Sequence, residues 1–140
     1  MGEPFYIPYD QIQVGDRTET SVVLTQEQVD QFSALIGDVD SFHVSDEAAA
    51  QTVFQRRICH GVHLLAYVSV TIGQKLPGFG TVYCSHTFEF HNPVYLGQGI
   101  HVTVTVLEKQ PRHRLLVDTV IIREDGAPVL TGQAVIRTYR

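Results

Sequence analysis

Residues 38–69 read DVDSFHVSDEAAAQTVFQRRICHGVHLLAYVS, and the rest of the chain is organised around this stretch. Its second half enters the longest apolar helix candidate in the sequence, which runs from about Gly61 to Lys75. Apolar side chains recur there at spacings of three and four, and other apolar residues cover much of the remaining helix surface. A helix that is apolar nearly all round is predicted to be buried.

One strand and two shorter helices are predicted ahead of the apolar run. Residues 18–24 are rich in β-branched side chains, which is typical of a strand. Thr25 and Gln28 have the spacing of a capping box, so a helix is predicted to begin there and to end at Gly37. Ser45, which two acidic residues follow, predicts the start of a second, short helix.

Strand-like segments fill the chain after a turn at residues 77–80. Residues 81–90 alternate, which predicts that one side of this strand carries Val82, Cys84, Phe88 and Phe90. Residues 100–106 alternate cleanly, and Asp125-Gly126 predicts a hairpin turn. The order predicts an α+β fold, with residues 1–140 as one domain, in which four successive antiparallel strands and the first strand curl around the long helix.

A single sheet layer would leave the long helix partly uncovered at one end. A second copy of the chain could cover it, and sheet edges could pair between the two subunits. We therefore expect a homodimer.

Composition excludes several classes of function. The net charge of −5 argues against a nucleic-acid partner held by phosphate contacts. No apolar run reaches the ~18 uncharged residues of a membrane span, and the N-terminus lacks the apolar core of a secretory signal, so we expect no membrane partner. Cys59 and Cys84 form no disulfide framework and are expected to be reduced, buried thiols, which favours a cytoplasmic protein. There is no P-loop, GxGxxG or GxSxG motif, so NTPase, dinucleotide-binding and nucleophile-elbow hydrolase functions lack support.

Asp38 and His43 lie five positions apart in a polar segment between two predicted helices. A carboxylate and an imidazole brought together can hold one water molecule and share its proton. From these residues alone, the alternative is that Asp38 caps backbone amides and that His43 only precedes a helix.

Gly61 begins the long helix, where backbone amides have no internal acceptor and carry partial positive charge. Its lack of a side chain would let a carbonyl oxygen approach those amides, although a glycine can equally serve a tight turn. Ser69, two turns further on, could face a substrate or donate back to a helix carbonyl. His60 and His63 lack the ligand spacing of a structural zinc site, so we predict no metal, and no other cofactor.

Together these motifs resemble the MaoC-like (R)-specific enoyl-CoA hydratases, which have the hot-dog fold. The family pattern Asp-x-Asn-Pro-x-His-x-Asp, followed by His-Gly before the central helix, is similar to residues 38–46 and to His60-Gly61 here. The segment FHNPVYLGQGI, residues 90–100, is similar to a further turn of the family. The resemblance covers most of the chain after about residue 10.

The resemblance implies a role for each matched residue. Asp38 and His43 would hold and activate water, the backbone amide of Gly61 would form an oxyanion hole, and Ser69 would support the active site. The substrate would be an acyl-CoA or acyl-carrier-protein thioester. The reaction would be the reversible hydration of a trans-2-enoyl thioester to an (R)-3-hydroxyacyl product by a homodimer. Candidates for contacts with CoA phosphates are Arg56, Arg57, Lys75, Arg112 and Arg114, although a solvated surface charge is the more common role for each.

Two positions depart from the family pattern. Asp40-Ser41 replaces Asn-Pro, so the loop loses a stiffening proline and gains a second carboxylate near Asp38. If both carboxylates are buried, their repulsion should raise one pKa. Arg56-Arg57 replaces Arg-Pro. Two alternatives therefore stay open: a hot-dog thioesterase, although residues 61–75 lack the helix carboxylate that many of those use, and a non-catalytic acyl-binding subunit.

Overall fold

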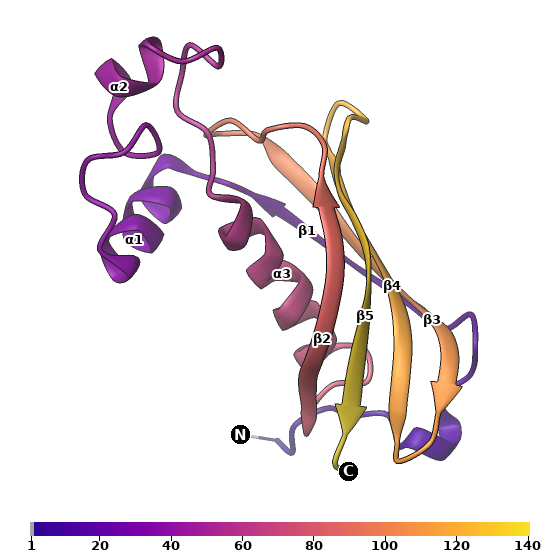
Figure 1. The fold of residues 1–140 in the computed structure, drawn as a ribbon. Coiled ribbons are helices and arrows are strands. Elements are labelled where there is room, and N and C mark those ends of the chain that lie inside the picture. The colour runs from indigo at the N-terminus through magenta and orange to yellow at the C-terminus, as the bar shows by residue number, and fades with distance from the viewer. Residues whose placement is uncertain (1) are drawn as a thin grey trace.

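A computed structural model describes residues 2–140, and its elements follow the predicted order (Figure 1). The helices are α1 (Gln26–Ile36), α2 (Asp46–Ala50) and α3 (Gly61–Gln74). The strands are β1 (Arg17–Val23), β2 (Thr81–Phe90), β3 (Gly99–Gln110), β4 (Arg114–Arg123) and β5 (Pro128–Thr138). A short 3-10 helix, Tyr9–Gln11, interrupts the extended lead-in. No helix within residues 2–140 is long and apolar enough to cross a membrane.

The five strands form one antiparallel sheet in the order β1-β3-β4-β5-β2. β3, β4 and β5 form a meander, and β1 adds to it along β3. β2 does not pair with β3, its successor in the chain, but crosses to the far edge and pairs with β5. The sequence predicts the strands but not this crossover, because strand periodicity carries no information about which strand is the neighbour.

The core lies between α3 and the inner face of the sheet, along which the helix runs (Figure 1). Leu64, Val68 and Ile72 of the helix are buried there. The predicted alternation in β3 is confirmed, since the residues at 100, 102, 104 and 106 are all buried. Each such side chain stabilises the fold by about 1.5–3 kcal/mol relative to an exposed one. The predicted α+β architecture, one sheet around one helix, is therefore confirmed.

The prediction that α3 is buried nearly all round is wrong for a single chain. Val62 is 57% exposed and Val70 is 40% exposed, and Ala66 and Ser69 lie on the same open face. The sheet covers only one side of the helix, so these residues have no cover within the described chain. An exposed apolar stripe on a core helix is typical of an interaction surface.

The predicted face of β2 is wrong for Val82 and Cys84, because a β-bulge lies between Tyr83 and Ser85, but it holds for Phe88 and Phe90 after the bulge, which face the core and α3. One extra residue on the bulged strand reverses which side chains face the core. Tyr83 and Phe88 therefore pack on the core, whereas Val82 and Cys84 are exposed. The expectation of two buried thiols thus fails for Cys84, which is exposed and free.

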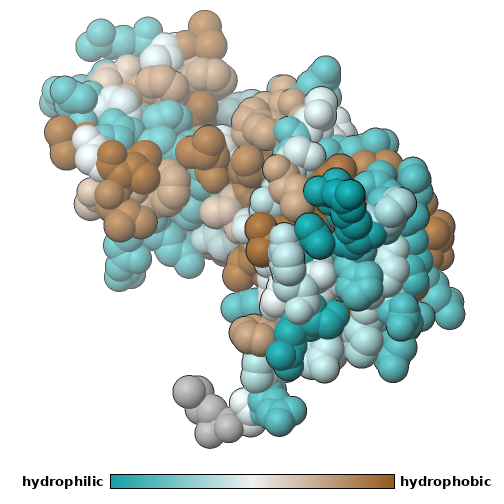
Figure 2. Space-filling view, turned by 60° about the horizontal axis from the view of Figure 1, so that its bottom comes forward, coloured by the Kyte–Doolittle hydropathy of each residue, from teal (hydrophilic) through white to brown (hydrophobic). Residues whose placement is uncertain are grey.

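The local signals around α1 are confirmed. Thr25 and Gln28 form the reciprocal capping box, and Gly37 ends the helix with a left-handed φ of 79°. α1 and α2 sit beside the N-terminal end of α3, apart from most of the sheet (Figure 1). Apolar side chains reach the surface of this region among hydrophilic ones (Figure 2), and its exposed large apolar residues are Leu35, Ile36, Val39 and Val53.

Candidate active site

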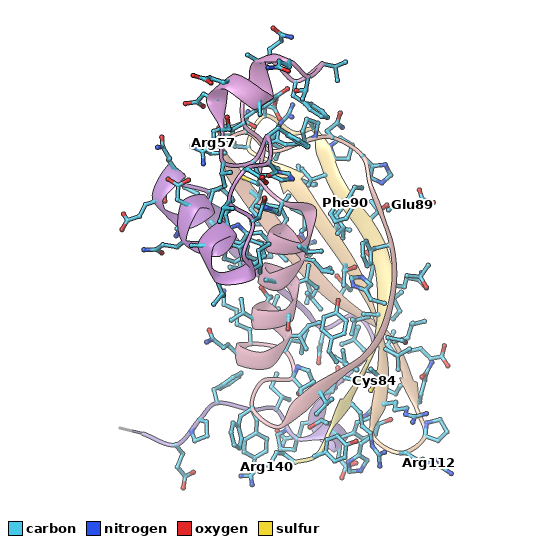
Figure 3. The ribbon with its side chains drawn as sticks, turned by 60° about the vertical axis from the view of Figure 1, so that its left-hand side comes forward. Arg57, Cys84, Glu89, Phe90, Arg112 and Arg140 are labelled. Atoms are coloured by element: carbon cyan, nitrogen blue, oxygen red, sulfur yellow. The ribbon has the colours of Figure 1, made fainter. Side chains whose placement is uncertain are left out.

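A pocket of about 530 Å³ opens at the N-terminal end of α3. Its walls come from three segments: the loop that holds His43, the approach to α3 with His60 and Gly61, and the end of β2 with Phe90. Phe90 and Arg57 lie at this end of the molecule, and Arg112 and Arg140 lie at the opposite end (Figure 3). The pocket is mainly apolar with a few polar side chains, which is the usual composition of a small-molecule site.

Asp38 is held by two donors that reach the same oxygen. Its Oδ2 accepts from Oγ of Ser41 at 2.6 Å and lies 2.6 Å from Nε2 of His60. The hydrogen bond from Ser41 and then that from His60 lower the pKa of Asp38, so the group is an ionised carboxylate at neutral pH. Its other oxygen, Oδ1, takes no hydrogen bond from the described residues and is free for a ligand or water.

The His43 imidazole is fixed through one ring nitrogen. Nδ1 lies 2.7 Å from the carbonyl oxygen of Ile58. A carbonyl only accepts, so Nδ1 must carry the proton, and the neutral ring keeps a lone pair on Nε2. Burial lowers the pKa of His43, and the nearby His60, whose ring centroid is 3.9 Å away, acts in the same direction. At neutral pH His43 is therefore a neutral imidazole with a free basic nitrogen.

The backbone of His43 is held from both sides. Its N–H donates to Oγ of Ser41 at 3.1 Å, and its carbonyl accepts from Nε of Arg57 at 2.7 Å. Arg57 is only 6% exposed, and its guanidinium also forms an ion pair with Asp30 of α1. α1 is thereby tied to the loop between residues 38 and 46.

Gly61 and Phe90 pack so closely that a side chain at position 61 would displace the Phe90 ring. A Cβ built on Gly61 would lie 2.7 Å from Cζ of Phe90. The preceding residue, His60, is the N-cap of α3 and makes no side-chain cap hydrogen bond. The His60 carbonyl accepts from His63 and Leu64, so the amides of Gly61 and Val62 have neither an intrahelical acceptor nor a side-chain cap, and both residues line the pocket.

The structure brings together three of the four predicted catalytic residues: Asp38, His43 and Gly61. Asp38 and His43 do not bond to each other directly; Ser41 and His60 link them. Ser69 lies on the exposed face of α3, outside the pocket of the single chain. Asp40 is exposed, so the condition for a raised carboxyl pKa is not met, and the pKa of Asp38 is lowered instead.

Three of the predicted phosphate-binding cations have different surroundings. Arg56 is exposed near the pocket, with its guanidinium 3.8 Å from the ring centroid of Tyr95. Arg57 is buried, and its guanidinium already donates to the His43 carbonyl and pairs with Asp30, which leaves little of it to contact a ligand. Lys75 follows the last turn of α3, about 20 Å from Gly61 along a helix of this length, and donates to the carbonyl of Glu19.

His60 is the residue of the site that sequence reasoning missed. Its spacing from His63 raised only the question of a metal, and within residues 2–140 no group of three His, Cys, Asp or Glu side chains could hold one. The available signal was its position: a histidine at a helix N-cap is not a favoured cap, so its side chain is free for another partner.

Comparison with known proteins finds relatives that match this chain over most of its length. The model of the MaoC like domain family matches residues 10–125. An (R)-specific enoyl-CoA hydratase from Aeromonas caviae is 33% identical over 128 residues, 90% of this chain and 95% of that protein. A 3-hydroxybutyryl-CoA dehydratase from Methylorubrum extorquens is 31% identical over 129 residues, 92% of this chain and 82% of that protein.

Solved structures agree. The R-hydratase PhaJ1 from Pseudomonas aeruginosa superposes with a TM-score of 0.89 at 35% identity, over 95% of this chain and 86% of that chain. The (R)-hydratase from Aeromonas caviae superposes with a TM-score of 0.86 at 31% identity, over 91% of this chain and 97% of that chain. The hot-dog fold that the sequence predicted is therefore confirmed.

Proposed function

Because the chain belongs to the MaoC-like domain family, we propose that it is a hydro-lyase that adds water reversibly to a trans-2-enoyl-CoA to give an (R)-3-hydroxyacyl-CoA. The observation that carries the proposal is that the neutral imidazole of His43 and the first residue of the core helix, Gly61, line one apolar pocket, and that the ionised carboxylate of Asp38 is hydrogen-bonded to His60, which lines the same pocket. The same chemistry run in reverse is a dehydration.

The thioester carbonyl would be polarised at the start of α3. Its oxygen accepts from the free backbone amide of Gly61, and the partial positive charge of the helix N-terminus stabilises the negative charge that develops there. Electron density then leaves carbon 3 of the double bond, which becomes the electrophile. Gly61 has no side chain to stand beside this amide, and the Phe90 ring packs against its Cα instead.

Water would be held between Asp38 and His43. Oδ1 of Asp38 accepts one hydrogen of the water, because Oδ2 already carries both protein hydrogen bonds. Nε2 of His43 takes the other proton as the water oxygen bonds to carbon 3. The imidazolium then returns that proton to carbon 2, so one molecule of water is added in balance. The proton lost and the proton gained lie on the same side of the double bond, so one base serves both steps.

The experiment follows the loss of the conjugated-thioester absorbance of crotonyl-CoA with the purified protein. Asp38→Asn and His43→Ala should each lower kcat by about 10²–10⁴-fold, the usual contribution of a positioned acid or base. Matched controls are Asp40→Asn, on the same loop, and His101→Ala, on β3; both should retain the wild-type rate. Absorbance loss with release of free thiol would indicate a thioesterase, and acyl-CoA binding without turnover a non-catalytic subunit.

We further propose that the chain works as a homodimer through α3 and β2. The open face of α3 carries Val62 and Val70, and β2 is a ten-residue edge strand whose one strand partner within residues 2–140 is β5. A second copy would cover this apolar stripe and pair the strand edge. Ser69 lies on that same face, so in the proposed dimer it would support the active site from within the subunit interface.

A further inference from the structure

A single hydroxyl joins the two proposed catalytic residues. Oγ of Ser41 donates to Oδ2 of Asp38 at 2.6 Å and accepts from the backbone N–H of His43 at 3.1 Å. We infer that Ser41 is a positioning residue of the active site: it fixes which carboxylate oxygen of Asp38 is free and where the His43 imidazole stands. The inference rests on the proposed function for its catalytic meaning, but the geometry can be tested without it.

The direction of these two hydrogen bonds follows from what each partner of Ser41 can donate or accept. An ionised carboxylate can only accept and a backbone N–H can only donate. The hydroxyl proton of Ser41 must therefore point at Asp38, and an oxygen lone pair must point at His43. The distance of 2.6 Å to Asp38 is that of a charge-assisted O–H···O⁻ bond. Ser41 has no alternative arrangement that satisfies both neighbours.

For Asp38, the consequence is a carboxylate that cannot turn. The terminal torsion of an aspartate is broad, so one hydrogen bond restrains it weakly. Ser41 of the same loop and His60 of the α3 N-cap reach Oδ2 from two different segments. Together they hold Oδ1 as the open oxygen, which is the one that the proposed water needs.

For His43, the hydroxyl supplies one of three restraints. The Ser41 hydroxyl accepts a hydrogen bond from the His43 backbone N–H, and Arg57 donates to the His43 backbone carbonyl. The carbonyl of Ile58 accepts from Nδ1 of the His43 ring. The imidazole is thus oriented by hydrogen bonds in a loop where no proline is present between residues 38 and 46. Loss of the Ser41 hydroxyl would free the N–H side of this peptide and loosen the ring that carries the base.

The charged and titratable groups around Asp38 come from every neighbouring segment. His43 and the exposed Asp40 share its loop, and His60 faces it from the N-cap of α3. Further residues pack behind these groups: the Arg57–Asp30 ion pair behind His43, and His63 of α3, which stacks on Phe32 of α1. Of all these groups, only His60 joins Ser41 in a hydrogen bond to Asp38.

The test compares Ser41→Val with Ser41→Thr, which differ from each other only by a methyl group in place of the hydroxyl. The titration of the Asp38 carboxyl is followed by ¹³C NMR and assigned with Asp38→Asn, and kcat and KM are measured with crotonyl-CoA. We expect Ser41→Val to raise the pKa of Asp38 and to lower kcat by about 10²-fold with little change in KM, the cost of a displaced catalytic group. Ser41→Thr should restore both.

A matched control is Ser45→Ala, a serine four positions along whose hydroxyl caps α2 by accepting from Ala48. It should lose stability without moving the Asp38 titration, as a merely structural serine would. The inference is overturned if Ser41→Val titrates and turns over like wild type, or if Ser45→Ala shifts the titration as far. Should wild type fail to hydrate any enoyl-CoA, the proposed function fails, while the NMR comparison still decides the role of Ser41.

Discussion

Nε2 of His60 lies 2.6 Å from Oδ2 of Asp38, so the N-cap of the core helix holds a loop carboxylate from 22 positions earlier in the chain. The other ring nitrogen of His60, Nδ1, is buried and has no hydrogen-bond partner among the described residues. The hydrogen of a neutral His60 ring is therefore placed on Nε2, where it is donated to Asp38. The polar loop and the first turn of α3 are thereby joined at the pocket.

His60→Ala should lower kcat by about 10²-fold, because Asp38 then keeps only Ser41 as a donor and can turn away from the water. Steady-state kinetics with crotonyl-CoA would measure this loss. A second readout is the Asp38 carboxyl titration, whose pKa should rise as one hydrogen bond to the charged form disappears. A His60→Ala protein with wild-type kcat would contradict the assignment.

The rate should depend on pH through His43. Burial lowers the pKa of His43 from 6.5, and the base must be neutral to act. The activity is therefore present at neutral pH and is lost as pH falls through the lowered pKa, so the midpoint of the acid limb of kcat/KM should lie below 6.5. The pKa of Asp38 is also lowered, which keeps its own titration at more acidic pH. A midpoint above 6.5 would show that another group controls the rate.

Gly61→Ala should destabilise the protein by about 1–3 kcal/mol, because its Cβ would lie 2.7 Å from Cζ of Phe90. The clash should be relieved in a Phe90→Ala background, so the penalty of Gly61→Ala should be smaller there. Urea unfolding of wild type, both single variants and the double variant would give this coupling free energy. Additive penalties would mean that the two residues do not meet.

The Arg57–Asp30 ion pair should respond unequally to loss of its two partners. The Arg57 side chain is 6% exposed, whereas that of Asp30 is 48% exposed. Asp30→Ala leaves a buried cation without its counter-charge, whereas Arg57→Met leaves a carboxylate that water can solvate. Asp30→Ala should therefore cost more, on the order of 1–3 kcal/mol in unfolding free energy. Equal or reversed costs in denaturant titrations would argue against a buried guanidinium.

Val70→Asp should convert the proposed dimer into a monomer, because it places a charge on the open apolar face of α3. Sedimentation velocity at micromolar concentration would follow the change. Val53→Asp is the matched control: Val53 is 89% exposed and lies after α2, away from that face. A wild-type protein that sediments as a monomer would rule out the dimer.

The local signals in the sequence were sufficient wherever short-range physics decides. The capping box at Thr25, the stop at Gly37 and the alternation of β3 all depend on residues within a few positions, and each is confirmed. The bulge in β2 defeats the same reasoning, because one inserted residue puts the side chains before it out of phase with those after it, and no residue type in the sequence indicates a bulge.

By itself, the sequence determined the helix at 61–74, the antiparallel strands and the loop residues from which the site is built. Only the tertiary structure decided that β2 joins β5, that one face of α3 stays open, and that His60 reaches the oxygen of Asp38 to which Ser41 also donates. The physical reason is the sequence separation over which each kind of interaction acts. Propensity and periodicity act between neighbours in the chain, whereas these contacts depend on where the packing of α3 against the sheet places segments that are distant in sequence.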